Sequence, residues 1–224
     1  MYLMQKRLII DAMSRFNLTL AQKSGLNKRE ISVLKKLNSP QKIQDFISGL
    51  PANLEKNGET LMSPRLIIKK KACHCIEGAL FAALALWLHG YQPLIVDMRA
   101  KRYDFDHVIA VFKHGDFWGA ISKTNHAITR FRDPIYRDLR ELLMSYFHEF
   151  YMWNTGIKTL VSYSKPFNLK SLRDNSWVTS LKPLWHIGKK LDKIPHHPFI
   201  LNKKVSLRPA DKFERKITKA TEYR

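Results

Sequence analysis

Cys75 and His107 are the residues whose types and positions could perform covalent chemistry. Cys75 begins the most apolar stretch of the sequence, where alanines and leucines predict a buried helix that stops at Gly90. The free N–H groups and the positive dipole end of a helix N-terminus stabilise an anion, so they lower the pKa of a cysteine placed there. The thiolate is the nucleophile, and the same N–H groups supply part of an oxyanion hole.

His107 opens the segment HVIAVFK, which predicts a β-strand about thirty residues after Cys75. A histidine at the start of a central strand can face the N-terminus of a helix packed on the sheet, where it forms a thiolate–imidazolium pair with a cysteine. A third polar group normally orients the imidazole. Ser122 and Asn125, at the end of the return strand and just beyond it, are the two candidates.

Each of these residues also has an ordinary structural interpretation. A buried cysteine is usually a small hydrophobic residue, and a single histidine is usually a hydrogen-bonded structural residue. Glu77 lies in the first turn of the predicted helix, where a carboxylate supports the helix dipole rather than catalysis. Asp106 precedes His107 and points to the opposite face of its strand, so it is not expected to pair with the imidazole.

Metal binding is the competing chemistry at the segment Cys73-His74-Cys75. This spacing is too tight for tetrahedral zinc, which prefers Cys-x2–4-Cys and a second ligand pair. His196-His197 could supply that pair only through the fold. The sequence has no Gly-rich phosphate loop, no His-Glu-x-x-His and no Gly-x-Ser-x-Gly. We therefore expect neither a metal nor an organic cofactor.

The elements that must position these residues follow an α+β order rather than alternating βαβ units. Residues 1–37 read as helical, and Ser39-Pro40 opens a further helix as N-cap and first-turn residue. After the central helix, strands are predicted over residues 93–98, 107–113 and 117–122, the last two joined as a hairpin through His114-Gly115-Asp116.

The chain after residue 132 is predicted to hold a helix, a strand and further short helices. Asp133-Pro134 is expected to open a helix that runs to about Met152, because its apolar residues follow the helical period. A strand is expected over residues 156–164, and short helices are expected near residues 169–172 and 181–191. The tail from Pro195 is basic and shows only a weak structural pattern.

The composition indicates a globular protein with an uneven charge distribution. The chain has 224 residues, is 45% hydrophobic and 11% aromatic, and carries a formal charge of +20. Residues 1–74 hold 14 Lys/Arg against 5 Asp/Glu, and residues 165–224 hold 15 against 5, whereas residues 75–151 hold nine of each. Basic flanks attract anionic partners such as nucleic acid, membrane surfaces or acidic proteins, or they simply keep the surface solvated.

The cysteines and the apolar runs predict a cytoplasmic protein. Cys73 and Cys75, the two cysteines, are one residue apart and cannot join distant segments, which fits a reducing compartment. The longest apolar stretch, Ala79–Leu88, is about half of the roughly 20 residues that a membrane span needs. The apolar run Leu8–Ile10 near the N-terminus is too short for a signal peptide. We expect no membrane span.

The series of motifs resembles the transglutaminase-like superfamily, which has a papain-like fold. The order is Cys at a helix start, His at a strand start and then Trp-x-x-x-polar on the return strand. The segments CIEGALFAALALWLHG, PLIVDM, DHVIAVF, WGAISKTNHA and RDPIYRDLRELLMSYFHEFY resemble a family of uncharacterised bacterial proteins in that superfamily. The match covers roughly residues 39–165, and the whole series is more specific than the short Cys-x-Glu-Gly-Ala element.

The resemblance implies a central buried helix that carries the nucleophile and packs on an antiparallel sheet that carries the histidine. Cys75 matches the nucleophile and His107 the base. The superfamily usually has Asp where this chain has Ser122, and Asn125 could replace it as Asn does in papain-like proteases. The expected organisation is an N-terminal helical extension (residues 1–38), a core (residues 39–165) and a basic helical segment and tail (residues 166–224).

Two functions follow as hypotheses. The first is a cysteine-dependent hydrolase or acyltransferase that acts on a protein or peptide amide through an acyl-enzyme, with no metal or organic cofactor. The second is a catalytically degenerate binding module whose basic flanks hold an anionic partner weakly and without specificity. The departure at Ser122 and the charge distribution favour the second, whereas the positions of Cys75 and His107 favour the first.

Overall fold

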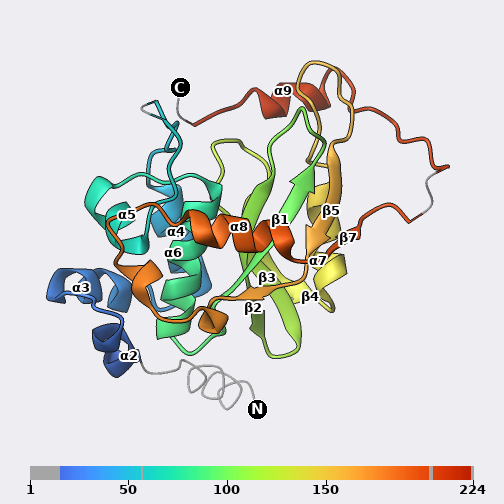
Figure 1. Cartoon of the computed structure of the whole chain (residues 1–224). Helices are drawn as coiled ribbons and strands as arrows, with labels where there is room; N and C mark the ends of the chain where they lie inside the picture. The colour runs from blue at the N-terminus through green and yellow to red at the C-terminus, as the bar shows by residue number, and fades with distance from the viewer. Residues whose placement is uncertain (1–15, 57, 202–203, 223–224) are drawn as a thin grey trace, which may run out of the picture.

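The structure is a computed structural model that describes residues 16–56, 58–201 and 204–222. These residues form an α+β fold around a seven-stranded antiparallel sheet, as the sequence predicts (Figure 1). The strand order is β4-β3-β2-β1-β5-β7, and β6 pairs with β1 beside this path. The strands are β1 (Leu94–Ala100), β2 (His107–His114), β3 (Phe117–Ile121), β4 (Arg132–Tyr136), β5 (Leu160–Ser164), β6 (Phe167–Asn168) and β7 (His196–Pro198).

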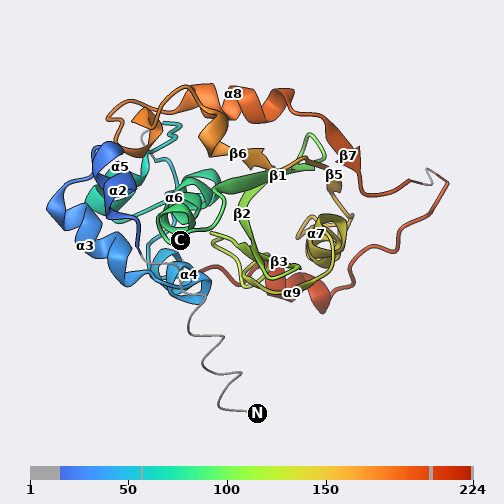
Figure 2. The same ribbon diagram turned by 90° about the horizontal axis from the view of Figure 1, so that it is seen from below.

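Helices cover both faces of this sheet. In Figure 2, α6 and α7 lie on opposite sides of β1, β2 and β3. One core forms where the first helices and α6 meet the sheet, and a second forms between the sheet and α7. The described α-helices are α2 (Leu18–Lys23), α3 (Lys28–Lys36), α4 (Pro40–Ser48), α5 (Pro64–Lys70), α6 (Cys75–Leu88), α7 (Leu139–Phe147), α8 (Trp185–Lys193) and α9 (Glu214–Thr218).

The central helix predicted from Cys75 is α6, and it is buried over almost its whole surface. It begins at Cys75 after His74 as N-cap and packs mainly on β2. The hairpin of β2 and β3 pairs Ala110 with Ile121 and Lys113 with Trp118. This antiparallel register brings the start of β2 and the end of β3 to the same edge of the sheet.

The helix expected from Asp133-Pro134 to about Met152 is wrong at both ends, because α7 spans only Leu139–Phe147. Residues 132–136 form the edge strand β4, and α7 begins only at Leu139, where the Asp138 side chain accepts a hydrogen bond from Glu141 N at 2.8 Å. Pro134 fits an edge strand because such a strand has one side without ladder hydrogen bonds, so a missing N–H is tolerated there. The predicted helical period is real, but it starts at the aspartate cap.

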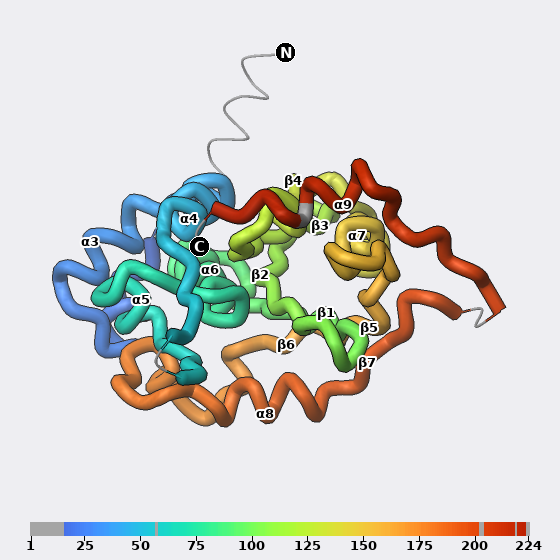
Figure 3. The backbone as a smooth tube through the Cα atoms, turned by 90° about the horizontal axis from the view of Figure 1, so that it is seen from above, coloured from blue at the N-terminus to red at the C-terminus, as the bar shows by residue number. Residues whose placement is uncertain are grey.

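The C-terminal segment is built into the fold more closely than its sequence pattern indicates. The weakly patterned tail from Pro195 contributes β7, which pairs with β5. Trp177, Leu169 and Ile187, which all follow residue 165, are buried in the core that contains α6. Figure 3 shows α8 outside β6 on one side of the molecule and α9 beside α7 on the other.

Helix α5 was not expected, although the sequence carries its signal. Its N-cap Ser63 accepts from Leu66 N at 3.3 Å and Pro64 follows, the same Ser-Pro start as the correctly predicted α4. Within residues 16–56, 58–201 and 204–222, no helix is long and apolar enough to cross a membrane.

Gly78 allows the start of α6 to approach the residue that follows β3 and Ser122. A Cβ added at Gly78 would lie 2.5 Å from Lys123 Cβ and 3.2 Å from Lys123 Cγ. Lys123 is itself buried, and its ammonium group donates to the main-chain oxygen of Leu50. Neither α6 nor the buried Lys123 can move away easily, so close packing requires a glycine at position 78.

Gly78→Ala should therefore lower the free energy of unfolding. Alanine gains about 1 kcal/mol of helix propensity over glycine, whereas overpacking a core costs about 1–3 kcal/mol, so we expect a net loss of up to about 2 kcal/mol. Urea denaturation measures the change. The matched control is Gly188→Ala in α8, where the new Cβ meets only Leu61 Cδ1 at 3.5 Å and should stabilise the protein. Equal effects at the two glycines would contradict the packing argument.

Candidate active site

Cys75 and His107 meet in a pocket of about 440 Å³ at the N-terminal end of α6. Cys75 is the first residue of α6 and is half-buried, and His107 is the first residue of β2 and is 8% exposed. The imidazoles of His107 and His74 lie close enough to the Cys75 thiol to lower its pKa. The fold therefore brings together the two residues that the sequence proposed as nucleophile and base.

This environment lowers the pKa of the Cys75 thiol. Burial alone would raise that pKa, but hydrogen bonds from His107 and His74 and the positive charge of the imidazoles outweigh burial and lower it to about 5. An ordinary cysteine has a pKa of about 8.5. This shift favours the thiolate of Cys75, which is the form that attacks electrophiles.

Ser122 fixes the orientation and the tautomer of His107. The Ser122 hydroxyl donates to the main-chain oxygen of Thr129 at 2.5 Å, and its Oγ lies 2.8 Å from His107 Nε2. A hydroxyl has one proton, and a carbonyl can only accept, so Ser122 must accept from an Nε2–H of His107. The other ring nitrogen, Nδ1, is then the one available to the thiol of Cys75.

The same geometry suits a serine at position 122. The side chain at position 122 lies between a donor, His107 Nε2, and an acceptor, the Thr129 carbonyl oxygen. Serine satisfies both groups, whereas an ionised carboxylate would only accept and would face the carbonyl oxygen with its negative charge. The departure at Ser122 is thus matched by its surroundings.

Thr129 is held in a strained conformation that aims its carbonyl group at Ser122. Its φ is +58°, which is unusual for a β-branched residue. The Thr129 N–H donates to Glu149 Oε2 at 2.6 Å, and Glu149 Oε1 accepts from Arg132 at 2.6 Å. The ion pair of Glu149 and Arg132 therefore holds Thr129 in place, and Thr129 in turn orients the Ser122 hydroxyl. The sequence offered no local signal for Thr129 or Glu149.

Asn125, the other candidate for orienting His107, lines the same pocket. Its main-chain oxygen accepts from Glu222 N at 2.9 Å, and His126 forms an antiparallel bridge with Thr221. The segment after α9 therefore supports this wall of the pocket, and Figure 3 shows it running back from α9 toward α4. Of the two candidates, Ser122 is the one that accepts a hydrogen bond from His107 Nε2, at 2.8 Å.

Glu77 is fully buried beneath the nucleophile and binds the surrounding chain. Its carboxylate accepts from the main-chain N–H groups of His74 and Met62 and from the side chains of Thr60 and Asn53, at distances of 2.8–3.1 Å. Burial raises its pKa, but hydrogen bonds and the charge of His74 outweigh burial and lower the pKa to about 2. As the sequence indicated, Glu77 serves the helix start, but its long-range partners were not predictable.

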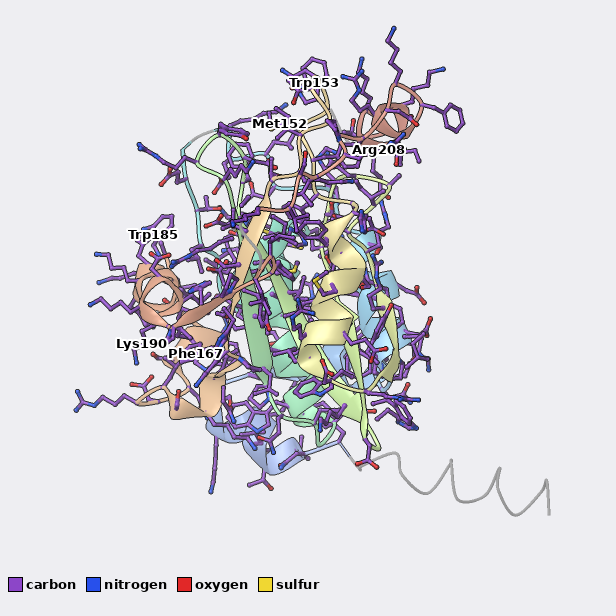
Figure 4. The ribbon with its side chains drawn as sticks, turned by 90° about the vertical axis from the view of Figure 1, so that its right-hand side faces the viewer. Met152, Trp153, Phe167, Trp185, Lys190 and Arg208 are labelled. Carbon is purple, nitrogen blue, oxygen red and sulfur yellow. The ribbon has the colours of Figure 1, made fainter. Side chains whose placement is uncertain are left out.

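The mouth of the pocket is apolar and aromatic. Phe105 and Trp153 line it and are 89% and 55% exposed, and Tyr103 and Leu54 also line it and are exposed. Figure 4 shows Met152 and Trp153 at one end of the molecule, near the segment that carries Arg208. Exposed aromatic residues around a pocket are typical of a binding surface.

The residues weighed as metal ligands lie in separate environments. Cys73 is buried under α6, and burial raises its pKa to about 12, although the nearby Lys123 acts in the opposite direction. His196, on β7, has its Nε2 atom 3.0 Å from Oδ2 of Asp97, on β1. Within the described part of the chain, no three His, Cys, Asp or Glu side chains gather so that they could hold a metal ion.

Comparison with known proteins adds no family assignment. No protein-family model matches the sequence, and no curated protein matches it. The resemblance to the transglutaminase-like superfamily therefore stays a prediction from the quoted motifs.

Replacing Glu77 should destabilise the protein in a pH-dependent way. Removing one partner of a buried ion pair costs about 3–5 kcal/mol, so Glu77→Gln should lose about that much of the free energy of unfolding near neutral pH. A carboxylate with a lowered pKa stabilises the fold above its ordinary pKa of about 4.3. Its contribution is lost as the pH falls toward about 2. The difference between wild type and variant should therefore shrink over that range.

Urea denaturation at a series of pH values measures this difference. Glu59→Gln is the control, because Glu59 belongs to the same loop region and is exposed. A Glu77→Gln effect that stays constant from pH 6 to pH 3 would show that the lost charge is not the cause.

Proposed function

We propose that this chain is a cysteine-dependent enzyme of the transglutaminase-like type that acts on a protein or peptide amide. The thiolate of Cys75 attacks the carbonyl carbon, and the electron pair of the C=O bond moves to oxygen. The N–H groups at the start of α6 stabilise that oxyanion. When the carbonyl re-forms, the C–N bond breaks, the amine leaves with a proton from His107, and a thioester remains on Cys75.

The second half of the reaction resolves this thioester. Water or an amine gives a proton to His107 and attacks the carbonyl carbon, and the C–S bond breaks with its electron pair returning to sulfur. Water yields a free carboxylic acid, and an amine yields a new amide. Both outcomes use the same groups, so the proposal covers hydrolysis and acyl transfer.

The observation that carries the proposal is the position of the Cys75 sulfur. It lies at the N-terminus of a buried helix, within reach of two imidazoles, in a pocket open to solvent. A cysteine with only a packing role has no need of such partners, and perturbed pKa values gather at functional sites. The pocket volume of about 440 Å³ falls within the range of ligand sites.

Alkylation of Cys75 by iodoacetamide tests whether the thiol is activated. In Cys73→Ala protein, the rate against pH should follow an apparent pKa near 5 rather than the ordinary value of about 8.5. His107→Ala should raise this pKa by about 1–3 units, because an opposite charge at this distance shifts a pKa by that amount. An ordinary pKa that does not respond to His107 would refute the proposed activity and favour the binding module with basic flanks.

Substrate turnover tests the role of Ser122 against that of Asn125. Losing a hydrogen bond of about 0.5–1.5 kcal/mol should lower kcat up to about tenfold in Ser122→Ala, because His107 is less well oriented. Asn125→Ala is the matched comparison and should change kcat less. A peptide-amide library identifies the substrate, and Cys75→Ala sets the background rate. A larger loss in Asn125→Ala than in Ser122→Ala would assign the orienting role to Asn125.

A further inference from the structure

His74 lies among acceptors that require a proton on its ring. Its Nε2 is 3.0 Å from the main-chain oxygen of Thr60, 3.3 Å from Glu77 Oε1 and 3.5 Å from Glu55 Oε1. None of these oxygens donates when the carboxyl groups are ionised, so Nε2 must donate. His74 is also the N-cap residue directly before Cys75, and the negative charge of that thiol raises the pKa of the His74 ring. His74 thus lies between a carboxylate and the nucleophile.

Glu77 has to keep its negative charge in this arrangement. Two main-chain N–H groups, from Met62 and His74, and the side chains of Thr60 and Asn53 all donate to it. Protonating the carboxyl group would give up several of these charge-assisted hydrogen bonds in a fully buried place. A buried carboxylate in turn requires a nearby cation, and His74 is the one in contact with it.

We propose that His74 is a second catalytic imidazolium, which Glu77 holds in its charged form and which stabilises the Cys75 thiolate without exchanging its proton. This inference rests on the proposed thiol chemistry and assigns a further residue to it. His107 is the imidazole that gives and takes the proton, because its Nε2 donates only to the neutral Ser122 hydroxyl. His74 supplies a constant positive charge, and Glu77 is the residue that positions and charges it.

The two imidazoles act at different stages of the reaction. As Cys75 attacks, its charge moves to the substrate oxygen, and His107 then passes its proton to the leaving amine. His107 is neutral in the thioester, but His74 remains positive beside the sulfur. When water or an amine attacks the thioester, the C–S electron pair returns to a sulfur that already faces a cation. A thiol of lower pKa leaves faster, so His74 promotes this last step.

The charged groups around His74 come from each element packed against it. Glu55 belongs to the loop before α5, Glu77 and Cys75 to α6, and His107 to β2 across the sulfur. On the other side of the helix start, Lys123 is buried near Cys73. Burial lowers the pKa of His74, but hydrogen bonds to Cys75 and Glu77 and the negative charges of these two groups outweigh burial and raise the pKa to about 10.

Thiolate absorbance near 240 nm measures the apparent pKa of Cys75 without any substrate. The experiment uses full-length Cys73→Ala protein and adds His107→Ala, His74→Asn or both, because asparagine also serves as a helix N-cap. His107→Ala alone should still titrate well below the ordinary thiol value, since His74 remains. His74→Asn alone should raise the pKa by about 1–3 units, and the double variant should titrate at or above about 8.5.

These outcomes separate the inference from the proposed function. If the pKa of Cys75 is low and depends on His107 but not on His74, the second imidazolium is refuted while the proposed activity stands. If the starting protein already titrates like an ordinary thiol, the proposed activity itself fails. Glu59→Gln serves as the control for a general change of charge, because it removes an exposed carboxylate.

Nuclear magnetic resonance of the wild-type chain gives a test that does not depend on a variant folding. The ring ¹⁵N shifts of His74 should report an imidazolium through pH 8. Alkylating Cys75 removes the thiolate and should lower the pKa of His74 while Glu77 still holds it above the ordinary value of about 6.5. A neutral His74 ring at pH 7 would overturn the inference.

Discussion

The buried negative charge of Glu77 is the constraint on which the site depends. A carboxylate removed from water must be surrounded by donors and paired with a cation, or it becomes strongly destabilising. Here the donors come from segments before α5 and from the N-cap of α6, and they include Asn53, Thr60, Met62 and His74. Satisfying this one charge fixes the loop that forms a wall of the pocket and the helix start that carries Cys75.

A second constraint acts at His107, on the other side of the Cys75 sulfur, and determines which group donates each hydrogen bond. The main chain of Thr129 is strained, and its carbonyl oxygen accepts a hydrogen bond from the Ser122 hydroxyl. That hydroxyl has no second proton to donate, so its oxygen must accept from His107. Glu149 and Arg132 hold Thr129 in place. An uncharged hydroxyl thereby orients His107, and in our proposal His74 adds a second positive charge beside the nucleophile.

The sequence predicted well those features that depend on neighbouring residues. The helix from Cys75, the hairpin that begins at His107 and the Ser39-Pro40 helix start all follow from local periodicity and capping. Prediction failed where the place of a segment in the sheet overrode its local pattern. Asp133-Pro134 has the form of a helix start, but the place of residues 132–136 at the edge of the sheet makes them a strand.

The sequence pointed to Cys75, to His107 and to the two candidates for orienting His107, Ser122 and Asn125. The order of Cys75 and His107 carried enough information to pair them, since each opens a recognisable element. The roles of His74, Thr129 and Glu149 depend on contacts between segments 14–20 residues apart, and no periodicity reports such contacts. The spacing of His74 and Glu77 resembles a capping box, and it is the one signal that could have drawn attention to them.

Two imidazolium groups beside one thiol accelerate some steps of an acyl transfer more than others. An ordinary cysteine is only a few per cent thiolate at pH 7, so full ionisation increases the reactive fraction roughly thirtyfold. A lower pKa also weakens the nucleophile, by a factor of about three for each pKa unit. Over the difference between about 8.5 and about 5, the two effects nearly cancel in the attack on the substrate. The gain therefore falls on expulsion of sulfur from the thioester, where the constant charge of His74 adds to that of His107, which has just taken a proton from the attacking water or amine.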